Sequence, residues 1–141
     1  MSLKSVAMFL LFCLSLSVFL TESLADDVAN IRVTFYAMGD VPYAPDEDVL
    51  LSKQISDLPG DAEFAIHVGD IKRGLPLCTE SVYRKVARIL SKSAAPVFII
   101  PGDNEWNDCI DPAQAWAYWD QYFMKFDRRW KHSLPVERQN I

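Results

Sequence analysis

The sequence predicts an α/β fold in which strands and helices alternate as βαβαβα along a mostly parallel sheet. Three short apolar stretches, at residues 31–38, 62–68 and 96–100, are each followed closely by Gly-Asp. The segments between and after them carry apolar residues at helical spacing. Because strands that alternate with helices are joined by right-handed crossovers, we expect the three strands to be parallel.

The N-terminal segment has the order of a secretory signal peptide. Lys4 precedes an apolar run from Val6 to Leu20, and Ser23-Leu24-Ala25 forms a small-x-small cleavage site. The alternative is a retained membrane anchor, but a spanning helix needs about 20 mainly apolar residues and this run is shorter. We therefore expect residues 1–25 to be a signal peptide and the mature protein to be secreted, with no membrane span after cleavage.

Residues 26–141 have the length of one domain rather than two. The formal net charge of the chain is −5, and removal of residues 1–25 leaves it unchanged. Non-specific binding to nucleic acid requires a basic face, so the composition carries no nucleic-acid-binding signature.

The first two strands each lead into a predicted helix. The strand at Ile31–Met38 precedes a helix from Pro45 to Leu58, which has acidic residues in its first turn. The strand at Ala62–Val68 precedes a helix that Thr79 can cap and that ends near Ser93. The apolar stripe of this second helix comprises Val82, Val86, Ile89 and Leu90.

The third strand, Pro96–Ile100, is apolar throughout, which predicts burial on both faces. Asp111-Pro112 then begins a helix that runs to about Phe126. Four aromatic residues recur along it at helical spacing, and we expect them to belong to the core: Trp116, Trp119, Phe123 and Phe126.

Cysteine usage agrees with export. Cys13 lies in the signal peptide, which leaves Cys78 and Cys109 as an even pair in an oxidising compartment. A bridge between them closes a loop of roughly 30 residues and is worth about 3–4 kcal/mol in chain-entropy models. Two free buried thiols are the alternative, and we favour the disulfide.

The candidate site consists of the aspartates that follow the strands: Asp40, Asp70 and Asp103. Aspartate after glycine is ordinary turn chemistry, and a single Gly-Asp would carry no further meaning. Three copies, each after an apolar strand, favour a shared metal site, because the carboxyl ends of parallel strands meet at one edge of a sheet. We expect the three carboxylates to converge there.

Convergent carboxylates repel one another, and a divalent cation relieves that repulsion. A shell of oxygen atoms favours Mg²⁺, Mn²⁺ or Ca²⁺, whereas added histidines would open the site to zinc or iron. One such ion can activate water, and two can stabilise both the attacking and the leaving oxygen of a displacement at phosphorus.

Other polar residues near these aspartates have simpler interpretations. His67 lies inside the second strand, where a lone histidine is more often a hydrogen-bonded core residue than a ligand. His132 lies in a polar stretch, and we expect it at the surface. Lys72 and Arg73 can meet a phosphate group, but we favour a solvated loop.

The three motifs resemble those of the calcineurin-like metallophosphoesterases over about residues 31–110. That family has Asp-x-His after its first strand, Gly-Asp after its second, and Gly-Asn-His followed by an acidic residue after its third. This chain has Gly39-Asp40-Val41-Pro42, then Gly69-Asp70, then Gly102-Asp103-Asn104-Glu105. The resemblance implies that residues 26–141 are the N-terminal part of such a domain.

The resemblance also implies a role for each matching residue. Asp40 is similar to a ligand of the first metal, and Asp70 to the carboxylate that bridges two metals. Asp103 stands where the family has a metal-binding asparagine. Asn104 stands where the family has a histidine that contacts substrate, and its amide can donate a hydrogen bond to a phosphoryl oxygen. Glu105 matches the last acidic position.

The chain departs from the family pattern at Pro42, which replaces a metal-binding histidine, and it contains no Gly-His-x-His segment. We expect a secreted phosphoesterase that uses two divalent ions, of Mn, Mg, Fe or Zn, on condition that a longer chain supplies the missing histidine ligands. Its substrate would be a phosphorylated small molecule or macromolecule. The alternative is a degenerate, non-catalytic metal-binding or interaction module of the same fold.

Overall fold

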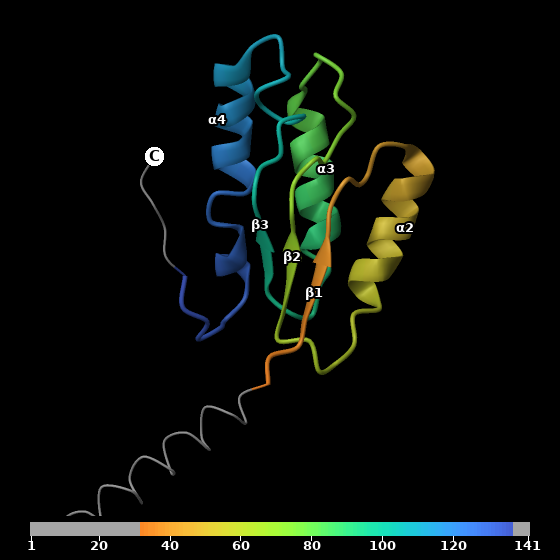
Figure 1. Ribbon diagram of the computed structural model, residues 1–141, viewed down its shortest axis with the longest axis vertical. Coiled ribbons are helices and arrows are strands. Elements are labelled where there is room, and N and C mark those ends of the chain that lie inside the picture. Colours follow the sequence, from red (N-terminus) through yellow and green to blue (C-terminus); the bar gives the residue numbers. More distant parts are fainter. Residues whose placement is uncertain (1–31, 137–141) are drawn as a thin grey trace, which may run out of the picture. The chain divides into compact units, whose positions relative to one another are not determined.

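A computed structural model describes residues 32–136 of the protein (Figure 1). The predicted signal peptide, residues 1–25, lies outside the described residues. The described chain from Thr34 onward forms one compact unit. Within this part of the chain, no helix is long and apolar enough to cross a membrane.

The sheet has three parallel strands in the order β1-β2-β3, as the sequence predicts (Figure 1). The strands are β1 (Phe35–Met38), β2 (Phe64–His67) and β3 (Val97–Ile99). Each is shorter than the apolar stretch that predicted it. Because all three run in the same direction, their carboxyl ends lie at one edge of the sheet.

A helix follows each strand, which confirms the βαβαβα order. These helices are α2 (Pro45–Ser56), α3 (Glu80–Leu90) and α4 (Pro112–Tyr122). The side chain of Asp111 accepts a hydrogen bond from the backbone N–H of Gln114 at 2.9 Å and so caps α4. The helix predicted to reach Phe126 is divided, because α4 ends at Tyr122 and a short 3₁₀ helix, η1 (Phe126–Arg129), follows.

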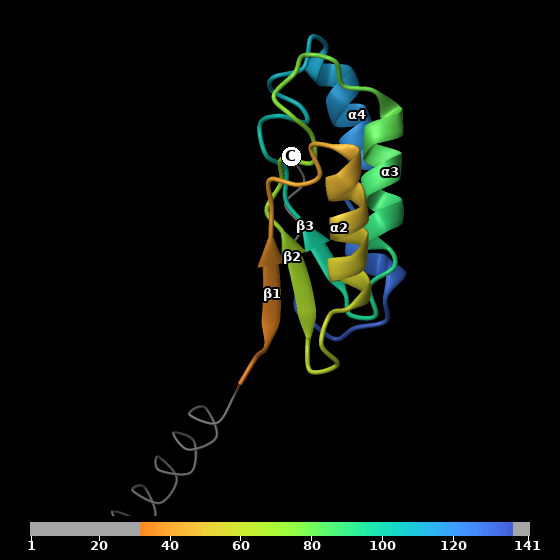
Figure 2. The same ribbon diagram turned by 90° about the vertical axis from the view of Figure 1, so that its right-hand side faces the viewer.

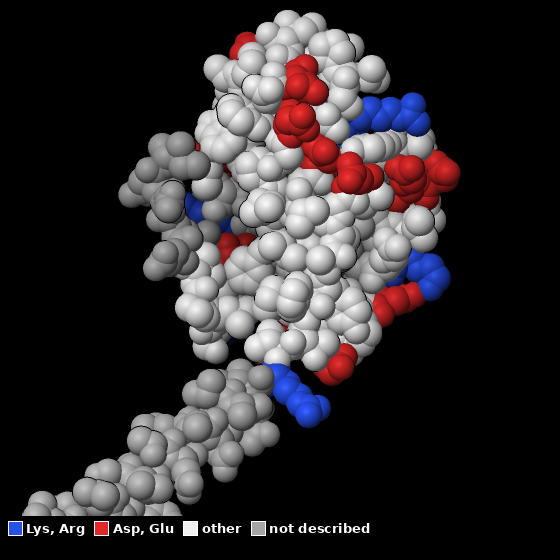
Figure 3. All heavy atoms as spheres, viewed as in Figure 1, with Lys and Arg blue, Asp and Glu red and all other residues white. Residues whose placement is uncertain are grey.

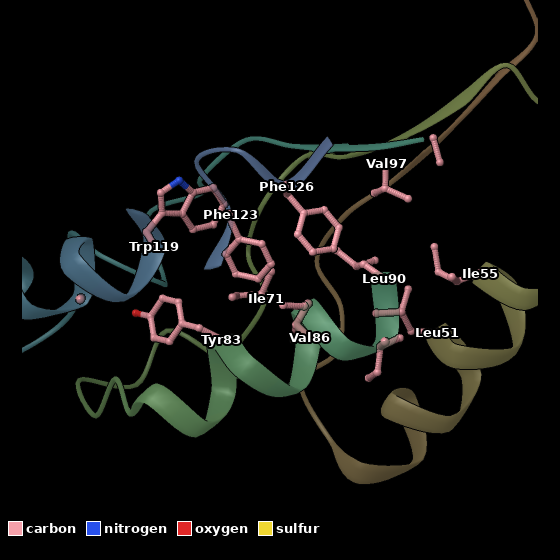
Figure 4. Close-up of a cluster of buried hydrophobic side chains, with 14 of the residues drawn as sticks. Leu51, Ile55, Ile71, Tyr83, Val86, Leu90, Val97, Trp119, Phe123 and Phe126 are labelled. Carbon is pink, nitrogen blue, oxygen red and sulfur yellow. The ribbon is translucent and has the colours of Figure 1, made fainter. Parts of the chain in front are cut away.

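The three helices lie on one face of the sheet (Figure 2). The core lies between them and the strands, where α3 contributes Tyr83, Val86 and Leu90 (Figure 4). Three of the four aromatic residues predicted to be core are fully buried: Trp119, Phe123 and Phe126. Trp116 is partly buried and packs against this cluster.

The other face of the sheet carries a row of aromatic rings. The Phe35 ring stacks on Phe64 with centroids 5.1 Å apart, and Phe64 meets Phe98 edge-on at 5.6 Å. Phe35 remains 54% exposed, and Phe98 is only partly buried. The prediction that the third strand is buried on both faces was therefore wrong, because the helices α2, α3 and α4 cover only one of them.

Candidate site at the carboxyl ends of the strands

The loops that carry the three aspartates contact one another at the carboxyl edge of the sheet. The backbone N–H of Asp40 donates to the carbonyl oxygen of Gly69 at 3.2 Å. The backbone N–H of Asn104 donates to Oδ1 of Asp70 at 3.3 Å. The fold thus places Asp40, Asp70 and Asp103 in three adjoining loops.

Glycine is required where the second and third loops meet. Gly69 has a φ of +91°, and a Cβ atom there would lie 2.8 Å from Cα of Gly102. A Cβ atom at Gly102 would lie 2.7 Å from the backbone nitrogen of Asp70. Both distances are shorter than any real Cβ contact, so these two glycines allow the close approach of the loops.

Two of the three aspartates have left-handed backbone conformations. Asp40 has a φ of 56° and Asp70 a φ of 57°. Aspartate tolerates this region better than most residues, yet the conformation still costs of order 1–3 kcal/mol. Such strain tends to occur at functional sites, where the surrounding structure holds the residue in place.

The carboxylates influence one another electrostatically. Burial is the main cause that raises the pKa of Asp70, and the negative charges of Asp103 and Asp40 raise this pKa further. The hydrogen bond from the Asn104 backbone opposes the effect. Asp70 therefore lies within the field of both other aspartates, where a cation would be attracted.

Glu105 holds the second and third loops together. Its side chain is fully buried and accepts hydrogen bonds from the backbone N–H groups of Gly102 (2.7 Å), Asp70 (3.1 Å) and Ile71 (3.2 Å). Burial raises the pKa of Glu105, while these three donors lower it. The carboxylate is thus a positioning group for both loops and not an open ligand.

Lys72 is buried, so the expectation of a solvated side chain in this loop was wrong. Its Nζ donates to the carbonyl oxygens of Arg73 (2.6 Å), Leu75 (2.6 Å) and Asn104 (2.7 Å). These three acceptors match the three donors of an ammonium group, which allows its burial. Desolvation lowers the pKa of Lys72, and the nearby carboxylates of Glu105, Asp108 and Asp70 oppose that shift.

The predicted disulfide between Cys78 and Cys109 is present, with Cα atoms 5.7 Å apart. It joins the segment before α3 to the segment before α4. Both sulfur atoms lie 3.8 Å from the carbonyl oxygen of Asn104, which also accepts the hydrogen bond from Lys72. The carbonyl group of Asn104 is therefore hydrogen-bonded to Lys72 and lies beside the disulfide.

Tyr43 belongs to the site, although the sequence analysis did not select it. Its hydroxyl group donates to Oδ1 of Asp40 at 2.7 Å and accepts a hydrogen bond from Nδ2 of Asn104 at 3.4 Å. Burial and the Asp40 carboxylate raise the pKa of Tyr43, so the phenol keeps its proton. The signal that could have identified it is its position three residues after Asp40, within the same loop.

Both described histidines have partners other than the carboxylates of Asp40, Asp70 and Asp103. His67 is fully buried: Nε2 lies 2.9 Å from the carbonyl oxygen of Val41, and Nδ1 accepts from the backbone N–H of Gly69 at 3.2 Å. This confirms a core role for His67. His132 was expected at the surface, but its side chain is only 13% exposed because it packs against Phe98 and lies 3.3 Å from Asp127.

Asp40, Asp70 and Asp103 offer carboxylate oxygens, which are the type of ligand that a hard divalent cation prefers. On the face shown in Figure 3, acidic side chains gather in a band at the end of the unit where the strands finish. Within residues 32–136, however, no group of three or more His, Cys, Asp or Glu side chains is arranged to hold a metal ion. One oxygen of Asp40 and one of Asp70 instead accept hydrogen bonds from Tyr43 and Asn104.

In comparisons with known proteins, no family model matches this chain, and no curated protein or solved structure is significantly similar to it. The α/β fold and the positions of the aspartate loops therefore rest on the structure alone. The resemblance to calcineurin-like metallophosphoesterases rests on the three motifs.

Proposed function

We propose that this protein is a secreted, metal-dependent hydrolase of phosphoesters. The observation that carries the proposal is the meeting of three Gly-Asp loops at one edge of a parallel sheet, where backbone hydrogen bonds join Asp40 to Gly69 and Asn104 to Asp70. Open α/β sheets bind their ligands at this edge. Secretion is supported by the signal-like order of residues 1–25 and by the disulfide.

Asp40, Asp70 and Asp103 would hold two divalent cations, with Asp70 shared between them as the motif resemblance implies. When bound, such cations polarise phosphoryl oxygens and lower the pKa of water, which is the chemistry that hydrolysis at phosphorus needs. Mn, Mg, Fe and Zn are all compatible with the proposal.

The neighbouring residues would orient the substrate. The Asn104 amide, now within 3.4 Å of the Tyr43 hydroxyl, would donate to a phosphoryl oxygen. Glu105 and Lys72 contact no substrate in this proposal and fix the loops that carry Asp70 and Asn104. Such support preorganises a site, because it limits the loop motions that ligand binding would otherwise have to restrict.

Hydrolysis assays on a matched pair of variants test this proposal. Asp70→Asn is expected to remove metal-stimulated hydrolysis of p-nitrophenyl phosphate and bis(p-nitrophenyl) phosphate. The loss should exceed the roughly 10–100-fold effect that is typical of residues outside the metal ligands. Asp61→Asn changes the exposed aspartate of another Gly-Asp turn and should retain activity. Equal activity in the two variants, or no metal-stimulated turnover by the unsubstituted protein, would contradict the proposal.

A second candidate is a non-catalytic cation-binding or interaction module of the same fold. Pro42 is buried where the family has a histidine ligand, and both described histidines are engaged elsewhere. This candidate predicts that divalent cations raise the melting temperature without turnover of any phosphoester. Thermal unfolding with and without chelator, run beside the hydrolysis assay, separates the two functions.

A further inference from the structure

A cavity of about 360 Å³ lies beside the candidate site. It is bounded by the loops that follow β1 and β2 and by the first half of α3, which contributes Val82 and Lys85. This volume lies within the range of roughly 300–1,000 Å³ that is typical of small-molecule sites. A larger cavity of about 470 Å³ lies between β1 and α2, but it is not lined by Tyr43, the residue of the smaller cavity whose hydroxyl group contacts Asp40 and Asn104.

The walls of the smaller cavity are mainly apolar. They include Pro42, Tyr43, Leu75, Leu77 and Val82. Leu75 is 59% exposed and Leu77 71% exposed, although both lie in the loop that also carries buried Lys72. Apolar side chains that remain exposed next to a polar site gain free energy when a ligand covers them.

One cation at this cavity is free to bind an anion. Within residues 32–136, Arg73 forms no ion pair, whereas Lys85 is held by Asp48 at 2.8 Å. Arg73 is exposed and lines the cavity. Its guanidinium group can bind a carboxylate or phosphate through two parallel hydrogen bonds.

Tyr43 connects the cavity to the candidate site. Tyr43 lines the cavity, and its hydroxyl group contacts Asp40 and Asn104. A phosphoester whose phosphoryl group lies at Asn104 can therefore extend its organic group past Tyr43 into the cavity.

We propose that this cavity binds the leaving group, and that the substrates are aryl phosphoesters that carry a second anionic group, recognised by Arg73. This inference rests on the proposed hydrolysis. In that reaction water forms a new bond to phosphorus as the bond from phosphorus to the aryl oxygen breaks. One proton of the water passes to the aryl oxygen, which leaves as a phenol, and the other remains with the phosphate product.

Binding of phosphonates that cannot be hydrolysed tests the assignment without the influence of leaving-group chemistry. Calorimetry with Mn²⁺ would compare ethylphosphonate, phenylphosphonate and 4-carboxyphenylphosphonate. We expect affinity to increase in that order, with a gain of about 10-fold or more from the carboxylate. Arg73→Gln should abolish the gain from the carboxylate, and Leu77→Ser should weaken both aryl ligands several-fold.

Two variants serve as controls. Arg88→Gln removes an exposed cation of α3 that does not line the cavity, and Leu50→Ser removes an exposed leucine from the larger cavity. Neither substitution should change the order of the three ligand affinities. Equal affinity for the three ligands, or an unchanged carboxylate gain in Arg73→Gln, would overturn the assignment. Turnover of phenyl phosphate by the same preparation reports separately on the proposed function, because its absence would overturn hydrolysis whatever the binding pattern.

Discussion

At the scale of single residues, the site depends on a carboxylate that faces inward. Glu105 accepts three backbone hydrogen bonds, two from the loop after β2 and one from the loop after β3. Hydrogen bonds to a charged acceptor are stronger than neutral ones, and leaving such buried donors unpaired is costly. Glu105 therefore stabilises the geometry of both loops.

The substitution Glu105→Gln tests this role. The glutamine amide turns an N–H donor toward backbone N–H groups, so we expect the free energy of unfolding to fall by about 2–3 kcal/mol. Urea denaturation at pH 7 measures the change. Glu63→Gln, at an exposed position, is the control and should have little effect. Similar stabilities for the two variants would show that Glu105 does not hold the loops.

His67 gives the stability a definite pH dependence. Burial lowers its pKa below the ordinary value of 6.5, so the unfolded chain takes up the proton more readily than the folded one. This contribution to stability is complete above pH 6.5 and is lost as the pH falls toward the folded pKa. We expect unfolding free energies measured between pH 7 and pH 5.5 to decrease, and to decrease less in His67→Gln. An equal slope in both proteins would contradict this account.

Residue types and spacing were sufficient to predict where the aspartates lie, but not which other side chains join them. Lys72 was assigned to solvent because a lysine in a loop is usually exposed. Its burial depends on three carbonyl groups, one of them from Asn104, 32 residues away in sequence. Tyr43 was missed for a similar reason, since its contact with Asn104 exists only after the loops meet.

At the scale of secondary-structure elements, the strand ends determine the site. Each βα unit supplies one Gly-Asp turn, and the parallel pairing of β1 with β2 and of β2 with β3 aligns them. Gly69 and Gly102 then allow the second and third turns to touch. The periodic apolar pattern predicted these units correctly, whereas the break between α4 and η1 carried no local signal.

The substitution Gly69→Ala should disrupt this contact. Its Cβ atom would collide with the backbone of Gly102, and the φ of +91° disfavours alanine in any case. We expect a loss of more than about 2 kcal/mol in the free energy of unfolding. Gly60→Ala is the matched control, because a Cβ atom there meets nothing within 4 Å. Chemical denaturation measures the stability of both variants. Equal stabilities would refute the contact between the second and third turns.

At the scale of the whole described unit, helices on one face leave an aromatic row on the other. Phe35, Phe64 and Phe98 shield one another through ring contacts, and His132 adds a fourth ring at the end of the row. The sequence could not distinguish a sheet covered on both faces from one covered on a single face, because its strands are apolar on both sides.

Charge is also distributed unevenly over this unit. The chain carries a formal net charge of −5, and on the face in Figure 3 acidic groups gather where the strands end. A field of one sign raises the local concentration of counter-ions, in this case cations. Such a field would favour the approach of the cations that we propose for the three aspartates.

A calorimetric titration with Mn²⁺ would measure whether the three aspartates form one cation site. We expect Asp40→Asn, Asp70→Asn and Asp103→Asn each to weaken Mn²⁺ binding by about 10-fold or more, while Asp61→Asn should bind like the unsubstituted protein. Pairs of the three substitutions should be non-additive, since the residues share a ligand. Unchanged Mn²⁺ affinity in all three variants would show that these aspartates form no cation site.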